Sequence, residues 1–127
     1  DFPLPDGRIL KISKISGEEF EKKSKIFPKT LQNCVNCDII DENFVIRNRR
    51  SGDFISLFSR NVTKTLKKLL NESKIETEKR DIIPMLACKN HVYWIDGIGV
   101  DRDAAVNKDC ESIFFFEVSE YKNGETK

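Results

Sequence analysis

The sequence predicts an α+β domain in which one or two helices pack on short, mainly antiparallel strands. Two observations lead to this fold class. Several runs of four to eight residues are rich in β-branched and aromatic side chains and lie between turn-forming residues. Only residues 61–73 show a strong helical repeat of apolar side chains. The chain of 127 residues fits one domain, residues 1–127, and can bury a small core.

The N-terminal part is predicted to contain a hairpin followed by a helix. Residues 2–4 and 8–15 form the strands, and Pro5-Asp6-Gly7 forms the turn, because proline presets one turn position and glycine accepts a positive φ. Ser16 is a candidate cap for a helix over 17–23, whose acidic first turn suits the positive end of the helix dipole. Residues 31–40 are ambiguous, with a strand expected around Val35 and Ile39-Ile40.

The middle of the chain carries the clearest helix. Strands are expected over 44–46 and 54–58, on either side of a turn at Ser51-Gly52-Asp53. In residues 61–73, the apolar side chains lie at i, i+4, i+7 and i+8, which is one face of a helix capped by Asn61.

The C-terminal part returns to strands. A short helical turn is expected at Thr77, and Pro84 ends it. Residues 85–88 and 91–95 are predicted to form a hairpin in which Asn90 takes the left-handed turn position. Residues 113–118 are almost continuously apolar, which is typical of a central, buried strand. Trp94 is expected to pack in the core rather than to stack on a ligand.

Charge is distributed unevenly along the chain. The net charge is +1, but residues 47–80 hold ten Lys/Arg and four Asp/Glu, a local balance of +6, which leaves −5 elsewhere. A basic segment in an otherwise acidic domain is suited to contacting phosphates on one side, although solvated helix faces also produce such runs. No apolar run reaches the roughly 18 residues that a membrane span needs, so we expect a cytoplasmic protein without membrane contact.

The chemistry-bearing side chains give little sign of catalysis. Cys34 and Cys37 form a CxxC pair, and Cys88 with His91 forms a CxxH pair, so these four residues are a weak candidate for a zinc site. A lone histidine is more often a packed or surface residue than a catalytic one. Asp101 and Asp103 are interpreted as solvated loop carboxylates. Gly52 lacks the companion glycines of a phosphate-binding loop. The isolated chain is therefore expected to be catalytically silent.

The order of motifs from Arg47 to Gly97 resembles the C-terminal domain of bacterial tRNA(Ile)-lysidine synthetase, best over residues 44–118. That family has an R-x-R-x-P-G-D segment, a lysine-rich helix, K-I-P, R-D-x-I-P and W-x-x-G. The matching positions here are Arg47, Arg49, Gly52, Asp53, Lys64, Leu66, Lys67, Lys74, Ile75, Arg80, Asp81, Ile83, Pro84, Trp94 and Gly97. Ser51 replaces the usual proline, and Gly99 and Ala105 stand where many members carry Arg and Lys.

The resemblance implies a layered fold containing a small β-sandwich, and a function in tRNA modification. The whole enzyme is a ligase that uses ATP and Mg²⁺ to attach lysine to the wobble cytidine of tRNA(Ile) with a CAU anticodon. The ATP-binding catalytic domain, with its SGGxDS motif, is absent from this chain. The expected partners are therefore tRNA(Ile) and the protein's own N-terminal catalytic domain. The resemblance also allows a homodimer formed through the parent protein.

The leading hypothesis is that this domain binds RNA through its basic segment. The predicted contacts to backbone phosphates are Arg47, Arg49, Arg50, Lys64, Lys67, Lys68, Lys74 and Arg80. Gly52 and Asp53 are interpreted as turn formers. Two alternatives remain open: a protein-interaction or scaffolding module that uses Phe114 to Phe116, and a zinc-stapled module built on the four Cys and His residues.

Overall fold

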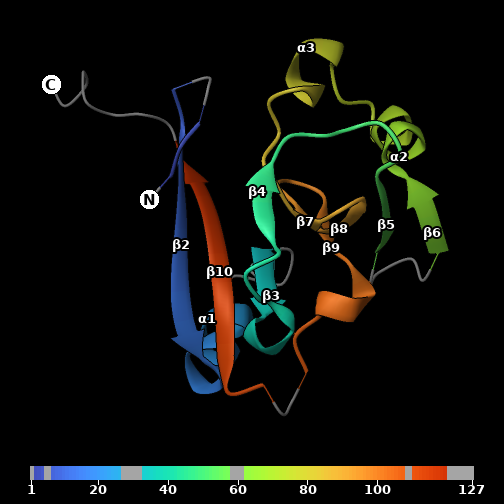
Figure 1. The fold of residues 1–127 in the computed structure, drawn as a ribbon. Coiled ribbons are helices and arrows are strands. Elements are labelled where there is room, and N and C mark those ends of the chain that lie inside the picture. The colour runs from blue at the N-terminus through green and yellow to red at the C-terminus, as the bar shows by residue number, and fades with distance from the viewer. Residues whose placement is uncertain (1, 5–6, 27–32, 58–61, 108–109, 120–127) are drawn as a thin grey trace, which may run out of the picture.

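A computed structural model describes residues 2–4, 7–26, 33–57, 62–107 and 110–119. The chain forms two mostly antiparallel sheets that face each other, with helices at both ends (Figure 1). The predicted α+β class with a β-sandwich-like layer is confirmed. No helix among the described residues is both long and apolar enough to cross a membrane.

The first sheet joins the two ends of the chain. Its order is β1-β2-β10-β3, and every neighbouring pair is antiparallel. The strands are β1 (Phe2–Pro3), β2 (Ile9–Ser16), β10 (Ser112–Ser119) and β3 (Cys34–Asn36). The predicted first hairpin is confirmed, although its turn residues 5 and 6 lie outside the described residues. The last strand, β10, is central as expected, but within it only Ile113 and Phe116 are buried, so the prediction that the whole strand is buried is wrong.

The second sheet carries the region of interest. Its order is β4-β7-β8-β5-β6, and β9 pairs with β8 beside this path. Only the β5–β8 pair of this sheet is parallel among the described residues. The strands are β4 (Val45–Arg47), β5 (Phe54–Leu57), β6 (Val62–Thr65), β7 (Met85–Cys88), β8 (His91–Ile95) and β9 (Gly99–Val100). The β7–β8 hairpin is as predicted, but Lys89 (φ 56°) takes the left-handed turn position rather than Asn90.

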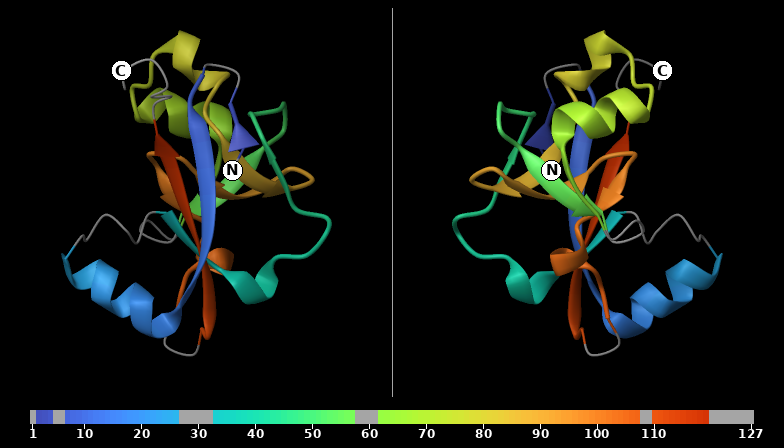
Figure 2. Two further views of the ribbon diagram at one scale, coloured as in Figure 1. Left: turned by 90° about the vertical axis from the view of Figure 1, so that its left-hand side faces the viewer. Right: turned by 90° about the vertical axis from the view of Figure 1, so that its right-hand side faces the viewer.

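Helices lie at opposite ends of the molecule. Near one end is α1 (Gly17–Ile26), which has no buried residues and projects away from the sheets (Figure 2). At the other end are α2 (Leu66–Glu72) and α3 (Thr77–Arg80) (Figure 1). Two short 3-10 helices are η2 (Cys37–Ile39) and η3 (Arg102–Ala104). Ile39 therefore belongs to η2 and Ile40 caps it, so the strand predicted at these two residues is wrong. The Ser16 cap is confirmed, because its hydroxyl accepts a hydrogen bond from the Glu19 amide at 3.1 Å.

The helix predicted over 61–73 begins later than expected. Residues 62–65 pair with β5 as a strand, and the Thr65 hydroxyl caps α2 by accepting from the Lys68 amide. The predicted cap, Asn61, lies outside the described residues. Val62, Thr63 and Thr65 are β-branched, which favours a strand. Val62 is 51% exposed, so it does not belong to the buried helix face. The remaining apolar positions, Leu66, Leu69 and Leu70, are buried as predicted.

Two of the three core clusters position the region of interest. One lies between α2 and the second sheet and includes Leu69, Ile55 and Val92. The other lies between the two sheets, where the ring of Trp94 stacks on Phe116 with centroids 4.4 Å apart. Trp94 is fully buried, which confirms the packing interpretation. Phe116 is also buried and Phe114 half-buried, and both line an apolar cavity of about 750 Å³ rather than an exposed patch.

Candidate nucleic-acid interface

Residues 48–53 form the loop that connects β4 to β5, and Arg47 is the last residue of β4. In Figure 1 this loop crosses the upper part of the molecule, below α3 and toward α2. Residues 47–53 contain the three arginines that the sequence predicts as phosphate contacts. The structure separates these arginines into one that supports the loop and two that reach a groove.

Arg47 is the supporting residue. Its guanidinium forms a bidentate pair with Asp53, with Nη1–Oδ2 2.8 Å and Nη2–Oδ1 2.7 Å. It also donates to the carbonyls of Asn48 and Lys89. The Arg47 side chain is only 7% exposed and that of Asp53 is fully buried. This burial and pairing argue against the predicted contact of Arg47 with phosphates, because its charge is neutralised inside the protein.

Asp53 fixes the shape of the loop. Its carboxylate accepts from the Arg50 amide at 2.7 Å and from the Asn90 side chain at 3.1 Å, in addition to Arg47. Burial by itself raises the pKa of Asp53, but these hydrogen bonds outweigh it and lower the pKa below its ordinary value. Gly52 adopts φ 88°, and a Cβ there would lie 3.4 Å from the side-chain nitrogen Nδ2 of Asn90. The turn-forming interpretation of Gly52 and Asp53 is confirmed.

A groove of about 540 Å³ lies between this loop, α2 and the end of α3. We call it the cationic groove. It is lined by Arg49, Arg50, Ser51, Gly52, Asp53, Thr65, Leu66, Lys67, Asn71, Arg80 and Asp81. Four predicted phosphate contacts thus converge from three separate segments of the chain. The charge balance favours anions, since Asp53 is already paired with Arg47 and Asp81 is the remaining carboxylate of the lining.

The cationic side chains of the groove differ in their hydrogen bonds to the protein and in their exposure. Arg80 is oriented by two hydrogen bonds, from Nε to the Ile75 carbonyl at 2.8 Å and from Nη1 to the Asn71 side chain at 2.6 Å. Arg49 donates from Nε to Asp81 at 2.8 Å, and the Asp81 side chain is 71% exposed. Arg50 and Lys67 are exposed. The groove therefore combines two oriented guanidinium groups with two solvated charges.

Besides Arg47, three further predicted contacts do not line the groove. Lys64 lies on β6 and forms an ion pair with Glu72 of α2. Lys68 is exposed on α2, and Lys74 follows α2 in a left-handed conformation with φ 55°. The spacing of Lys64, Lys67 and Lys68 in the sequence is that of one helix face, but Lys64 lies on β6 and precedes α2.

Sequence reasoning missed Asn71 as a support for Arg80 and Asn90 as a support for the loop. Asn71 carries a weak local signal, because it lies on α2 one residue from the buried Leu70. Asn90 carries none, because it acts on a loop 37 residues away.

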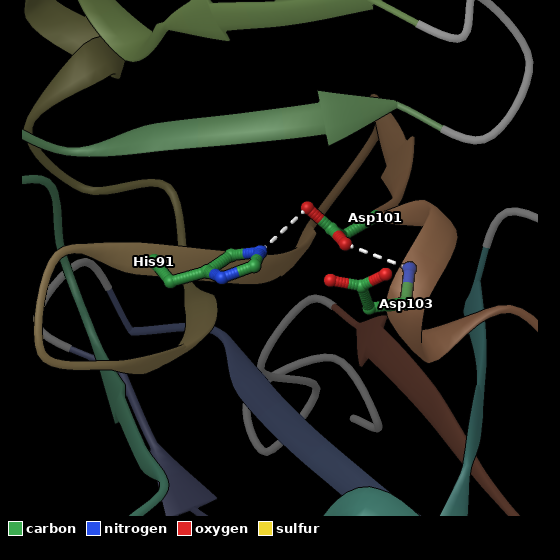
Figure 3. Close-up of side chains that lie close together, drawn as sticks. All are labelled: His91, Asp101 and Asp103. Carbon is green, nitrogen blue, oxygen red and sulfur yellow. Dashed lines mark hydrogen bonds and ion pairs between the residues drawn. The ribbon is translucent and has the colours of Figure 1, made fainter.

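The candidate zinc ligands are distributed differently from the prediction. Among the described residues, metal-ligating side chains come together in one group of three, which is His91, Asp101 and Asp103 (Figure 3). Cys34, Cys37 and Cys88 are not part of it. Burial raises the pKa of the Cys34 thiol to about 12, so this side chain is a neutral core residue. Asp101 is fully buried, which contradicts its interpretation as a solvated loop residue.

Comparison with known proteins agrees with this fold. The sequence profile of the TilS substrate C-terminal domain matches residues 44–115. The tRNA(Ile)-lysidine synthase of Persephonella marina is 34% identical over 80 residues, which are 63% of this chain and 18% of that protein. The protein of the same name from Caldanaerobacter subterraneus is 30% identical over 80 residues, which are 63% of this chain and 17% of that protein.

A solved structure extends the similarity to the N-terminal strands. A crystal structure of a TilS C-terminal domain superposes with a TM-score of 0.69 and 20% identity. It covers 94% of this chain and 88% of the other chain. The matched segment thus represents less than a fifth of the two relatives, whereas the fold matches almost a complete domain.

Proposed function

Since this chain belongs to the TilS substrate C-terminal domain family, we propose that it is the tRNA-binding C-terminal domain of a tRNA(Ile)-lysidine synthase. In this proposal the parent protein is a cytoplasmic ligase that attaches lysine to the wobble cytidine of tRNA(Ile) with a CAU anticodon. The partners of the domain are that tRNA and the N-terminal catalytic domain of the same protein. A homodimer of the parent protein is compatible with this arrangement.

The observation that supports RNA binding is the convergence of Arg49, Arg50, Lys67 and Arg80 on one groove. Guanidinium groups suit phosphate because their planar donors match its oxygens, and oriented guanidiniums lose less freedom on binding. Contacts of this kind fix the position of the RNA backbone without reading bases. The domain would therefore hold a helical part of the tRNA by shape, while the modification takes place elsewhere.

ATP and Mg²⁺ belong to the parent enzyme in this proposal, and the present residues do not fit them. The Gly52 turn cannot serve as a phosphate-binding loop, because the Asn90 side chain covers it and donates to the Ser51 carbonyl. The role of this chain in the reaction is therefore to bind and orient the substrate. The proton and phosphoryl chemistry is assigned to the catalytic domain.

The test is binding of the 127-residue chain to a fluorescent tRNA(Ile) transcript at several salt concentrations. If phosphates are neutralised, log affinity falls linearly with log salt, and each lost contact lowers the slope by about 1. We expect Arg50→Ala and Lys67→Ala each to weaken binding and to flatten the slope. Lys11→Ala and Lys14→Ala are matched controls, because both lysines are exposed on β2 in the other sheet.

Two outcomes would overturn the proposal. One is a folded chain with no measurable affinity for tRNA at low salt. The other is a uniform loss of affinity in groove and control variants alike, which would indicate unspecific attraction rather than a site. The interaction-module alternative loses its original support, because Phe116 is buried and its neighbours Phe114 and Phe115 are half-buried.

A further inference from the structure

A second polar cluster lies on the second sheet, outside the cationic groove. His91 begins β8, Asp101 directly follows β9, and Asp103 belongs to η3. Figure 3 shows the three side chains turned toward one another from these two separate segments. Their potential ligand atoms all lie within 4.8 Å of one another, and His91 Nε2 is 2.8 Å from Asp101 Oδ2.

The surrounding residues hold two of these side chains in place. The His91 ring stacks on Tyr93 with centroids 4.0 Å apart and also contacts Phe54 at 4.8 Å. Asp101 Oδ2 accepts from the Ser56 amide at 2.9 Å, and Oδ1 accepts from the Asp103 amide at 2.8 Å. Supports of this kind orient metal ligands in proteins by fixing the ring and the carboxylate. Asp103 is exposed, so its side chain can turn and solvent can reach the cluster.

The electrostatics of the cluster favour a cation. The Asp101 side chain is completely buried, and its basic partner among the described residues is His91, which carries charge only when protonated. Because an imidazole carries no permanent charge, the buried carboxylate has no permanent counter-charge among the described residues, and Asp103 adds a second carboxylate.

We propose that His91, Asp101 and Asp103 bind a divalent transition-metal ion of the zinc type. One imidazole nitrogen with two carboxylates is a donor set that such ions accept, whereas Mg²⁺ prefers oxygen ligands alone. Two neighbouring ligand atoms, each about 2.1 Å from a shared tetrahedral ion, lie about 3.4 Å apart. His91 Nε2 and Asp101 Oδ2, now hydrogen-bonded at 2.8 Å, would have to separate by about 0.6 Å when the ion takes the place of the hydrogen.

Binding replaces a proton by the metal. In the metal-free protein, the Nε2 hydrogen lies between His91 and Asp101; in the metal-bound protein, Nε2 donates its lone pair and the ring proton resides on Nδ1. A doubly protonated ring releases one proton to solvent. Asp101 Oδ2 can keep the Ser56 hydrogen bond, since a carboxylate oxygen has two lone pairs. Three protein ligands leave further coordination positions to water.

The test is isothermal titration of the 127-residue chain with zinc chloride, with metal analysis after dialysis. It uses a Cys37→Ser/Cys88→Ser background, so that the half-buried thiols cannot contribute. We expect one equivalent of zinc and an affinity about tenfold or more weaker in Asp103→Asn, since even outer-shell changes cost 10- to 100-fold. Asp103 is exposed, so this substitution leaves folding intact, which circular dichroism would check.

Asp38→Asn is the matched control. Asp38 occupies the same position in η2 as Asp103 in η3, with its amide bonded to the Asn36 cap, and it is also exposed. It should not change zinc affinity. The proposal is overturned if the serine background abolishes zinc binding, or if Asp103→Asn and His91→Gln bind zinc as tightly as their parent. Neither result depends on whether the chain binds RNA.

Discussion

The buried pair of Arg47 and Asp53 connects the end of β4 to the start of β5, with two hydrogen bonds of 2.8 and 2.7 Å. The segment from Arg47 to Asp53 therefore has two functions, which are carried by different residues. Arg47 and Asp53 face inward and shape the loop, whereas Arg49 and Arg50 line the cationic groove. A substitution at each position should separate stability from RNA affinity.

Arg47→Ala should lower the free energy of unfolding by about 3–5 kcal/mol, because it leaves a buried carboxylate without its partner. Urea denaturation followed by circular dichroism would measure this change. Arg50→Ala is the control and should change stability by less than about 0.5 kcal/mol, since Arg50 is exposed. If Arg47→Ala remained as stable as the wild type and lost only RNA affinity, Arg47 would be a direct contact.

The pH dependence of stability should reveal Asp53. Its pKa is lowered in the folded protein, so its contribution is fully present above the unfolded value of about 3.9 and is lost as pH falls through the folded pKa. The stability difference between wild type and Asp53→Asn should therefore shrink below about pH 4. Urea titrations between pH 3 and pH 7 would measure it, and a constant difference would contradict the pairing.

Asp96 should affect the pH dependence of stability in the opposite direction to Asp53. Burial raises the pKa of Asp96, and Arg8, 3.8 Å away, only partly opposes this effect. Its ionised form therefore costs stability at neutral pH, and this cost disappears as pH falls through the raised pKa. Asp96→Asn should be more stable than the wild type at pH 7, and the two should converge in acid. The same titrations test this expectation.

Lys74 ends α2 in a Schellman motif. Its own amide donates to the Asn71 carbonyl, and the next amide, of Ile75, donates to the Leu70 carbonyl. The position has φ 55°, where an L-residue costs about 1–2 kcal/mol and glycine is preferred. Lys74→Gly relieves this cost, but glycine loses about 0.5–1 kcal/mol more chain entropy on folding. The net effect should be a stabilisation of the protein by about 0.5–1 kcal/mol. Lys68→Gly, inside the same helix, should instead destabilise by about 1 kcal/mol.

The strands and the groove differ in how far sequence patterns could predict them. The β7–β8 hairpin, β10 and the Leu66–Leu69–Leu70 face follow from local patterns, namely turn residues, an apolar run and a helical repeat, which depend on neighbouring residues alone. The start of α2 does not, because the pairing of residues 62–65 with β5 decides it. Likewise, three arginines within four residues look equivalent in the sequence. Only the positions of Asp53 and Asp81 in the folded chain show which arginine is buried, which is paired at the surface and which is solvated.

The fluorescence of Trp94 tests whether a base of the bound tRNA stacks on this side chain. It is the single tryptophan of the chain, it is fully buried, and its indole nitrogen donates to Asn33 at 3.1 Å. Its emission should be blue-shifted and should not be quenched when tRNA binds, because bases cannot reach the ring. Trp94→Ala should cost about 3–5 kcal/mol of stability. Strong quenching by tRNA in the folded chain would show that a base stacks there.

Asp81 should limit the affinity of the cationic groove. Its carboxylate pairs with Arg49 at 2.8 Å but is 71% exposed, so the pair contributes no more than about 1 kcal/mol. A phosphate that approaches Arg49 must displace this carboxylate and is repelled by it. Asp81→Asn should therefore tighten tRNA binding by up to about fivefold at low salt, with the gain decreasing as salt screens the charge. Fluorescence anisotropy at two salt concentrations would measure the tRNA affinity. Glu78→Gln is the control, because Glu78 is an exposed carboxylate of α3 outside the groove lining. Equal or weaker binding by Asp81→Asn would mean that the carboxylate orients Arg49 for the phosphate instead of competing with it.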